Sequence, residues 1–425
     1  MQPTAYVQRR QMEGLDRARL EDHQLQRLNA LLGAILPSNR LYAQKLAGCQ
    51  IPLAHLYDLL QFPFTTKEEL LGTGADGCFA ANRTYPRDRY LRFHRTSGTR
   101  GRPLTVVDTA EDWRWWLDCW QYVLDAADIG PSDRALMAFT YGPFIGFWSA
   151  HDALLARSVP VVPGGGMSTV ARLELLAASR ATVLFCTPTY ALRMAEVARQ
   201  RGIKSAAFAL RRVVVAGEPG GSVSATRARI EEAWGAQVVD HCGATEVGPW
   251  GCGDHEGRGL RVLESEFIAE FLSVDTDKPA AAGELAQLVI TTLGRYGCPV
   301  IRYRTGDLVR PTWELSGPNR FVLLEGGVLG RADNMMIVRG VNIFPSSVEQ
   351  ILHGFPEVVE YRLTARRVGT MDQLFVEVED RLNRPGRIAD ELRLRLGLKV
   401  EVRTVPLGTL PRHEAIGKRF VDERR

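Results

Sequence analysis

Between residues 133 and 292, short apolar runs alternate with stretches of helical periodicity, and this alternation restricts the fold more than any other feature. The apolar runs are 135–139, 159–163, 182–186, 212–217 and 237–243. Helical stretches such as 170–179 and 222–235 separate them. Strands that alternate with helices indicate βαβ units and a parallel sheet, in which ligands bind where strands end and loops begin. We therefore predict an α/β fold.

Helices are expected before and inside this region. Apolar residues at helical spacing predict a helix over 12–36, which Pro37 ends, and Ser38 is expected to cap a short second helix. A further helix from Thr109 to Ala127 is rich in tryptophan. Burial tendencies place its tryptophans in the core, and these are Trp113, Trp115, Trp116 and Trp120.

A capped helix start is also predicted after Pro63. Thr65 or Thr66 would be the cap, and Glu68 or Glu69 would return a hydrogen bond to it.

The length of 425 residues is too great for one ordinary core and indicates two or three domains. Residues 282–313 look rich in β-structure, and the chain changes character after about residue 330. There, strand patterns and a helical pattern predict a small α+β domain. These patterns cover 334–340, 357–368, 373–380 and 387–405. We predict domains at 1–330 and 331–425.

Charge and cysteine content exclude several classes of protein. The net charge of +4 is small for this length, so no nucleic-acid or membrane partner is expected, although anionic substrates are suited to it. The seven cysteines are odd in number and contain no CxxC pair, which favours a reducing cytoplasm over a disulfide scaffold. The polar N-terminus resembles no signal peptide, and no apolar run is long enough to span a bilayer.

The segment RFHRTSGTRGRPLTV at 92–106 has the composition of an anion-binding loop. Its hydroxyls and unshielded backbone N–H groups can converge on an anion, and glycine permits close approach. It is not a Walker A loop, which requires GxxxxGK[ST]. The alternative for this segment alone is a flexible basic turn. The residues that would bind are Thr96, Ser97, Gly98, Thr99 and Gly101, with Arg95, Arg100 and Arg102 adding charge.

Two carboxylates follow strand patterns further along the chain. Glu246 follows an apolar strand and a Gly-Ala-Thr turn, where a hard oxygen ligand suits Mg²⁺ bound to phosphates. Asp307 lies in a turn after a β pattern, where an acidic residue can take both ribose hydroxyls. A salt-bridged loop and a turn-forming Gly-Asp pair are the respective structural alternatives. Arg331 and Asp333 mark the predicted domain boundary.

The order and spacing of these motifs resemble the phenylacetate–coenzyme A ligase family of the adenylate-forming superfamily. The resemblance covers about residues 10 to 425. It is carried by FPFTTKEEL (62–70), TSGTRGRP (96–103), YGPF (141–144), PGGG (163–166), TPTY (187–190), VAGEP (215–219), GATEVGP (243–249), IRYRTGDL (301–308), GRADNMMIVRGVNIFPSSVE (330–349) and GTLPRHE (408–414).

The resemblance implies a large N-terminal adenylating region of several subdomains and a mobile C-terminal domain. It also implies formation of an acyl-adenylate from a carboxylic acid and Mg-ATP, followed by transfer to coenzyme A. Glu246 would hold Mg²⁺, and Thr245 would contact the α-phosphate. The residues that would cradle the β- and γ-phosphates are Thr96, Ser97, Gly98, Thr99 and Gly101. The remaining nucleotide contacts would be Arg102, Ala216, Gly217, Glu218, Pro219, Cys242, Gly243, Ala244, Asp307 and Arg331. Asp333 would be the hinge, and Gly340 and Asn342 would approach the pantetheine arm of coenzyme A.

Aromatic residues and glycines indicate the acid that is bound. Aromatic walls over glycine floors favour a planar ring, so we expect an aryl or arylacetic acid. For each aromatic residue, a place in the ordinary core is the alternative. The expected pocket residues are Tyr141, Phe144, Phe147, Trp148, Gly164, Gly165, Ala216 and Gly243.

The chain departs from the family pattern at several positions. Arg102 stands in place of the lysine of the phosphate loop, Cys242 in place of a tyrosine, and Thr245 in place of a serine. In the tail, an ungapped alignment puts Ile416 at the position of the catalytic lysine, whereas a shift of two residues puts Lys418 there. Both readings remain open, and Lys418 is the candidate catalytic lysine.

Three further expectations concern metals, acceptors and partners. Cys252, His255 and Cys298 could bind zinc only with a fourth ligand from elsewhere, and unligated cysteines are the favoured reading. An aryl-acid AMP ligase that passes the acyl group to a carrier protein, an amine or a hydroxyl in natural-product biosynthesis is the alternative function. A non-catalytic nucleotide-binding relative is a second alternative, and a homodimer is plausible from the family resemblance.

Overall fold

The structure is a computed structural model that describes residues 5–71, 79–96, 103–139, 142–332, 336–338, 341–343, 345–368, 371–396, 398–411 and 419–424. Its centre is a nine-stranded sheet in the order β13-β14-β9-β8-β7-β6-β5-β3-β4. The parallel strands are β3 (Ala135–Met137), β4 (Val161–Pro163), β5 (Val183–Cys186), β6 (Arg212–Ala216) and β7 (Gln237–Ala244). The predicted βαβ units and parallel sheet are confirmed.

Four helices connect or flank the parallel strands, as the helical stretches predicted. They are α6 (Ile145–Ala156), α7 (Thr169–Ser179), α8 (Pro188–Gln200) and α9 (Ser224–Trp234). The same sheet continues with antiparallel strands, because β7 turns directly into β8 through a short hairpin. These strands are β8 (Gly248–Gly253), β9 (Gly259–Val262), β13 (Pro311–Thr312) and β14 (Leu323–Glu325).

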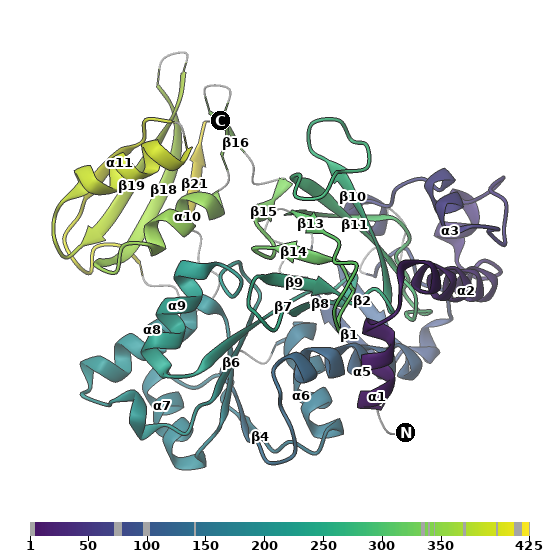
Figure 1. The fold of residues 1–425 in the computed structure, drawn as a ribbon, viewed down its shortest axis with the longest axis horizontal. Coiled ribbons are helices and arrows are strands. Elements are labelled where there is room, and N and C mark those ends of the chain that lie inside the picture. Colours follow the sequence, from purple (N-terminus) through teal and green to yellow (C-terminus); the bar gives the residue numbers. More distant parts are fainter. Residues whose placement is uncertain are drawn as a thin grey trace.

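A second sheet confirms that 282–313 is rich in β-structure. It has four antiparallel strands, β10 (Phe267–Ser273), β11 (Ala286–Thr292), β12 (Tyr303–Val309) and β15 (Gly330–Arg331). In Figure 1 this sheet stands beside the antiparallel end of the central sheet. Strand β12 of this sheet contains the IRYRTGDL motif from Tyr303 onward.

The N-terminal helices differ from the prediction in two respects. The single helix expected over 12–36 is two helices, α1 (Tyr6–Glu13) and α2 (Arg17–Ile35), because the Asp16 side chain accepts a hydrogen bond from the Arg19 amide and starts a new helix. Asn39, and not Ser38, caps α3 (Arg40–Lys45). A short 3₁₀ helix, η1 (Leu56–Gln61), follows.

The helix start after Pro63 is confirmed as a reciprocal cap. In front of α4 (Lys67–Leu71), the Thr66 amide donates to Glu69 and the Glu69 amide donates back to the Thr66 hydroxyl.

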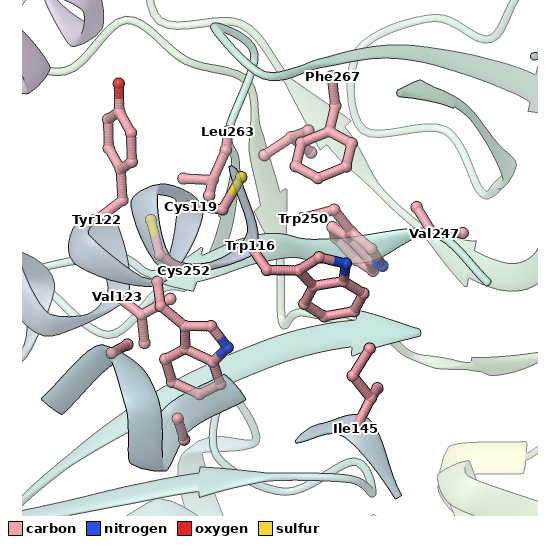
Figure 2. Packing of buried hydrophobic residues seen from close by; sticks show 14 of the residues in the cluster. Trp116, Cys119, Tyr122, Val123, Ile145, Val247, Trp250, Cys252, Leu263 and Phe267 are labelled. Atoms are coloured by element: carbon pink, nitrogen blue, oxygen red, sulfur yellow. The ribbon is translucent and has the colours of Figure 1, made fainter. Parts of the chain in front are cut away.

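The tryptophan-rich helix α5 (Ala110–Ala126) is confirmed, with Thr109 as its N-cap. All four predicted tryptophans are at most 7% exposed, so their assignment to the core is correct. Figure 2 shows Trp116 of α5 beside Trp250 of β8, with Phe267 and Val247 nearby. Helix α5 therefore packs against β8 of the central sheet and against Phe267, the first residue of β10 in the second sheet.

The C-terminal part has its own sheet and its own core. The sheet order is β20-β19-β18-β21, and the apolar residues of 348–400 form a separate buried cluster. Its elements, with the short β16–β17 hairpin that precedes them, are β16 (Met336–Val338), β17 (Val341–Ile343), α10 (Pro345–His353), β18 (Val358–Val368), β19 (Met371–Asp380), α11 (Pro385–Leu396), β20 (Glu401–Thr404) and β21 (Phe420–Glu423). The α+β character is as predicted.

Helix α10 connects this C-terminal unit to the rest of the molecule (Figure 1). The Thr226 hydroxyl on α9 lies 2.6 Å from Nδ1 of His353, and Arg229 donates to the His353 carbonyl at 3.3 Å. Burial lowers the pKa of His353 to about 3, so its imidazole is neutral in this contact. Within the described ranges, no helix combines the length and apolar character needed to cross a membrane.

Candidate active site

The carboxyl edge of the parallel sheet gathers most of the segments expected to bind substrate. Residues 142–148 follow β3, 164–165 follow β4, 187–190 follow β5, 217–219 follow β6 and 245–246 follow β7, and residues 216 and 243–244 are the last of β6 and β7. Because parallel strands end at the same edge, these segments, far apart in the sequence, share one side of the sheet. This edge is the candidate active site.

A β-hairpin positions the phosphate loop. Strands β1 (Arg92–Arg95) and β2 (Thr105–Asp108) pair antiparallel, with Arg95 opposite Thr105. The Thr96 amide donates to the Leu104 carbonyl at 2.9 Å, and the Leu104 amide donates to the Thr96 hydroxyl at 2.9 Å. The hairpin is therefore closed directly below the loop. The other predicted phosphate ligands, Ser97, Gly98, Thr99, Gly101 and Arg102, lie outside the described residues.

Glu246 lies in the tight turn between β7 and β8, immediately after Thr245. Its Oε1 accepts a hydrogen bond from the Tyr303 hydroxyl at 2.9 Å, and Nζ of Lys67 is 3.7 Å away. The side chain is 11% exposed, so it is enclosed yet reaches the surface of the edge. Tyr303 is buried, and this burial raises the pKa of its phenol. The nearby negative charge of Glu246 raises the same pKa further. The phenol is consequently a hydrogen-bond donor.

Asp307 and Arg331 form an ion pair beside this turn. They face each other in the pairing of β12 with β15, and Nη1 of Arg331 donates to Oδ1 of Asp307 at 2.9 Å. Gly306 has φ of +78°, and a Cβ there would lie 2.7 Å from Nη2 of Arg331. Burial and the charge of Asp307 raise the pKa of the Cys242 thiol, so Cys242 is near the pair and neutral. The structure thus brings three predicted nucleotide contacts together.

Glu218 follows β6 in a segment predicted to contact the nucleotide. Its Oε1 accepts from the Thr189 amide at 2.8 Å and from the Thr189 hydroxyl at 2.5 Å. Gly217, with φ of +92°, makes the turn between Ala216 and Glu218. Pro219 lines a cavity of about 160 Å³, together with Ser222, Val223, Ser224, Arg258, Gly326, Val328 and Leu329. On one side, the segment is therefore held by hydrogen bonds from Thr189 of the TPTY motif. On the other side, it borders the cavity.

The predicted acid-pocket aromatics fall into different environments. Phe147 is 5% exposed and meets Phe139 edge-on at 4.4 Å, so it lies in the core, the alternative considered for every aromatic here. Phe144 is 44% exposed, and the half-buried Trp148 donates to the Gly142 carbonyl at 2.9 Å. Among the described aromatic residues of the proposed slot, Phe147 therefore forms a buried base, and Phe144 and Trp148 form a more open rim.

Glycines follow the adjacent strand β4. Gly164 donates to the Met137 carbonyl and accepts from Nε of Arg172, and a Cβ on it would lie 2.9 Å from that carbonyl. Gly165 is half-buried. The main chain therefore passes close to β3 here, which supports a glycine floor.

Several predicted residues cannot be placed. Tyr141, Asp333, Gly340, Ile416 and Lys418 lie outside the described residues. The backbone of Asn342 lies in β17.

The candidate zinc ligands are not brought together. Cys252 is buried in β8, Cys298 is buried near Asp108, and His255 lies in the turn after β8. Over the described ranges, no group of three histidine, cysteine, aspartate or glutamate side chains could hold a metal ion.

Three supporting contacts in the site were not expected from the sequence, although Thr189 and Tyr303 belong to motifs named above. Tyr303 supports Glu246, Thr189 holds Glu218, and Arg295 donates to the Thr245 carbonyl at 2.9 Å. The period of two in a strand would have indicated Tyr303, because residues 303, 305 and 307 share one face. Arg295 gives no such signal.

Comparison with known proteins defines the class. The model for the AMP-binding enzyme family matches residues 80–266, and the model for the AMP-binding enzyme C-terminal domain matches residues 340–424. The structure superposes on a crystal structure of 2-hydroxyisobutyryl-CoA ligase in the postadenylation state, bound to an acyl-AMP, with a TM-score of 0.91 and 25% identity; the match covers 97% of this chain and 91% of that one. The TM-score falls to 0.73 for the same ligase in the thioesterification state. The fold and site define an adenylate-forming acid–thiol ligase.

Sequence relatives define the family within that class. The chain is 32% identical to the phenylacetate–coenzyme A ligase of Thermus thermophilus, over 95% of this chain and 96% of the relative. It is also 32% identical to the phenylacetate–coenzyme A ligase of Escherichia coli, over 95% of each. The chain therefore belongs to the phenylacetate–coenzyme A ligase family, as the motifs indicated.

Proposed function

We propose that this enzyme activates an aromatic carboxylic acid with ATP and transfers the acyl group to the thiol of coenzyme A. The observation that carries the proposal is that Tyr303, Asp307 and Arg331 of the second sheet converge with Glu246, which follows the parallel strand β7. These groups would supply contacts for the magnesium ion and for the ribose of the nucleotide. The family relatives are ligases of phenylacetate, an aromatic acid.

In the first half-reaction, a carboxylate oxygen attacks the α-phosphate of ATP and pyrophosphate leaves. Both reactants are anions, so the site has to offset their repulsion with preorganised donors and cations. Residues 96–102 would hold the β- and γ-phosphates, Thr245 would contact the α-phosphate, and Asp307 would take the ribose hydroxyls. Arg331 would keep Asp307 oriented through the 2.9 Å ion pair. Lys418 is the candidate lysine between the acid and the α-phosphate.

Glu246 fits a magnesium ion, since its carboxylate is a hard oxygen ligand at the surface of the edge. Mg²⁺ commonly takes one or two protein carboxylates and completes its shell with water and phosphate oxygens, so no cluster of protein ligands is required. When bound, the ion would neutralise charge on the phosphates. Tyr303 would hold the carboxylate in a fixed orientation toward it.

In the second half-reaction, the thiol attacks the acyl carbon and AMP leaves. The C-terminal domain, proposed as 331–425, would turn about Asp333 between the two steps, and Gly340 and Asn342 would approach the pantetheine arm. The higher similarity to the postadenylation state of 2-hydroxyisobutyryl-CoA ligase supports a first-step arrangement for the present structure. The contact between α9 and α10 would then break for the second step.

The acid slot would lie between the residues after β3 and β4 and the turn at Gly243. Cys242, smaller than the tyrosine of the family pattern, would leave room for a substituted ring. The six described cysteines are free thiols, which supports a cytoplasmic location.

An exchange assay against a panel of acids tests the proposal. Purified enzyme would be mixed with ATP, Mg²⁺, labelled pyrophosphate and each of a set of benzoates and arylacetates. We expect exchange with at least one aromatic acid, and a thioester detected by mass when coenzyme A is added. Exchange with aliphatic acids alone would refute the aromatic slot, and acyl-AMP that accumulates without thioester would indicate a different acceptor, such as a carrier protein.

A further inference from the structure

Arg295 is an arginine with no exposed surface, and it lies between two parts of the site. It follows β11, and its Nη1 donates to the Thr245 carbonyl at 2.9 Å. On the other side its Nε donates to Oδ1 of Asp108 at 2.8 Å, and Nη2 is 2.7 Å from the same oxygen. The Trp116 ring packs against the guanidinium, with its centroid 5.2 Å from Cζ, and its Nε1 donates to the same aspartate.

The two partners belong to the two elements that would hold the pyrophosphate half of ATP. Asp108 ends β2, the strand that returns from the phosphate loop and pairs with β1. Thr245 begins the turn that carries Glu246. The Arg295 side chain therefore connects the β1–β2 hairpin to the backbone of the turn that carries Glu246. Arg295 is 187 positions from Asp108 and 50 positions from Thr245 in the sequence.

Stability alone does not account for this arrangement. Burial raises the pKa of Asp108 to about 6 even though Arg295 opposes the shift, which indicates the cost of keeping the charge there. Well-packed apolar residues can replace such a buried pair without loss of stability. The planar guanidinium of arginine, by contrast, fixes the direction of the hydrogen bonds that it donates. Among the buried side-chain atoms described, Nδ1 of His94 and Oδ2 of Asp108 have no hydrogen-bond partner, although they are only 4.0 Å apart. A cluster that leaves such atoms unpaired is not optimised for stability alone.

We propose that Arg295, paired with Asp108, is a positioning residue for the adenylation step, because it fixes the Thr245–Glu246 turn relative to the β1–β2 hairpin that flanks the predicted phosphate loop. The inference rests on the proposed function of those two elements. Pyrophosphate leaves after adenylation, so the distance between the phosphate loop and the Glu246 turn matters for the first half-reaction. Transfer of the acyl group from the adenylate to coenzyme A involves only the α-phosphate, which Thr245 would contact, so it depends much less on this distance.

The test compares the two half-reactions in an Arg295→Gln variant. ATP–pyrophosphate exchange reports the first step, and release of AMP from synthetic acyl-AMP plus coenzyme A reports the second. We expect exchange to fall on the order of 100-fold, the effect typical of a displaced catalytic group. The KM for Mg²⁺ should rise, and acyl transfer should stay within about threefold of the unaltered enzyme. Arg295→Lys keeps the charge and not the fork, so it should recover only part of the exchange.

Arg261 provides the matched control. It is 5% exposed, its Nε donates to Asp254 at 2.9 Å, and its Nη1 donates to the Phe321 carbonyl at 2.8 Å, away from the site. Arg261→Gln should change both half-reactions by the same factor. Should Arg295→Gln fail to fold, the double variant Asp108→Asn, Arg295→Gln removes both buried charges and should show the same split.

Two results would overturn the proposal. Equal losses in both half-reactions would make Arg295 a structural residue, and unchanged exchange would remove it from the site. Failure of the unaltered enzyme to exchange with any acid would instead refute the proposed function, so the two failures are distinguishable.

Discussion

The Tyr303 hydroxyl donates to the Glu246 carboxylate, and a Tyr303→Phe substitution removes that donor while keeping the buried ring. A hydrogen bond to a charged group contributes about 1.5–3 kcal/mol. The other nearby cation, Lys67, is 3.7 Å away and 37% exposed, so it would contribute less than about 1 kcal/mol and cannot replace the phenol. A loss of about 2 kcal/mol from the positioning of Glu246 corresponds to roughly a 30-fold decrease in kcat/KM, since 1.4 kcal/mol is tenfold.

The assay is ATP–pyrophosphate exchange at a series of Mg²⁺ concentrations. The substitution should lower kcat/KM and raise the Mg²⁺ concentration needed for half-maximal rate, with little change in melting temperature because Glu246 still reaches solvent. Tyr122→Phe is the control, since Tyr122 is also buried but its hydroxyl lies 3.0 Å from the Ser265 hydroxyl. Exchange within twofold of the unaltered enzyme, or an equal loss in the control, would refute the reasoning.

Three further predictions follow from the geometry. Gly306→Ala places a Cβ 2.7 Å from Nη2 of Arg331 in left-handed backbone, so it should cost about 1–2 kcal/mol of stability and weaken ATP binding in a nucleotide titration; unchanged affinity would contradict the assignment of the pair. Thr226→Val removes the hydroxyl that contacts His353, so amide hydrogen exchange in α10 should rise about fivefold, and an unaltered rate would argue against this contact as a link between the units. Burial lowers the pKa of His241 to about 4, so below pH 6.5 the unfolded chain binds a proton that the folded chain does not, and stability is lost as the pH falls toward 4. The stability advantage of the unaltered enzyme over His241→Gln should therefore shrink by up to about 1.4 kcal/mol per pH unit in that window, and parallel denaturation profiles would contradict this.

Local sequence signals predicted the architecture of the parallel sheet well. Strand β5 and helix α7 were evident because burial on both faces of a parallel strand leaves a continuous apolar run, and a helix against a sheet has a 3.6-residue period. Helix starts were predicted less well. Ser38 and Asn39 are both suitable caps, and the choice of Asn39 depends on its second set of contacts, a hydrogen bond from its side-chain amide to the Asn82 carbonyl 43 positions away.

Motifs also located much of the candidate site. Glu246 and Glu218 each follow a parallel strand, and the edge rule for parallel sheets places such residues together. Asp307, which was expected in a turn, instead lies inside the antiparallel strand β12, because that strand continues to Val309 and pairs with β15. The aromatic residues were less predictable, because Phe144 and Phe147 lie three positions apart yet one is 44% and the other 5% exposed. A residue's exposure depends on what packs against its helix, which spacing alone does not specify.

The sequence by itself determined the class of fold, the family and the edge of the sheet that we propose as the active site, because these follow from periodicity and from motifs within short stretches of chain. Only the tertiary structure decided which side chains support those motifs. Tyr303 reaches Glu246 across 57 positions, and Arg295 reaches the Thr245 carbonyl across 50. Such contacts form between strands of different sheets, where register and packing set the distances, and a backbone carbonyl that accepts a hydrogen bond has no signature in the sequence.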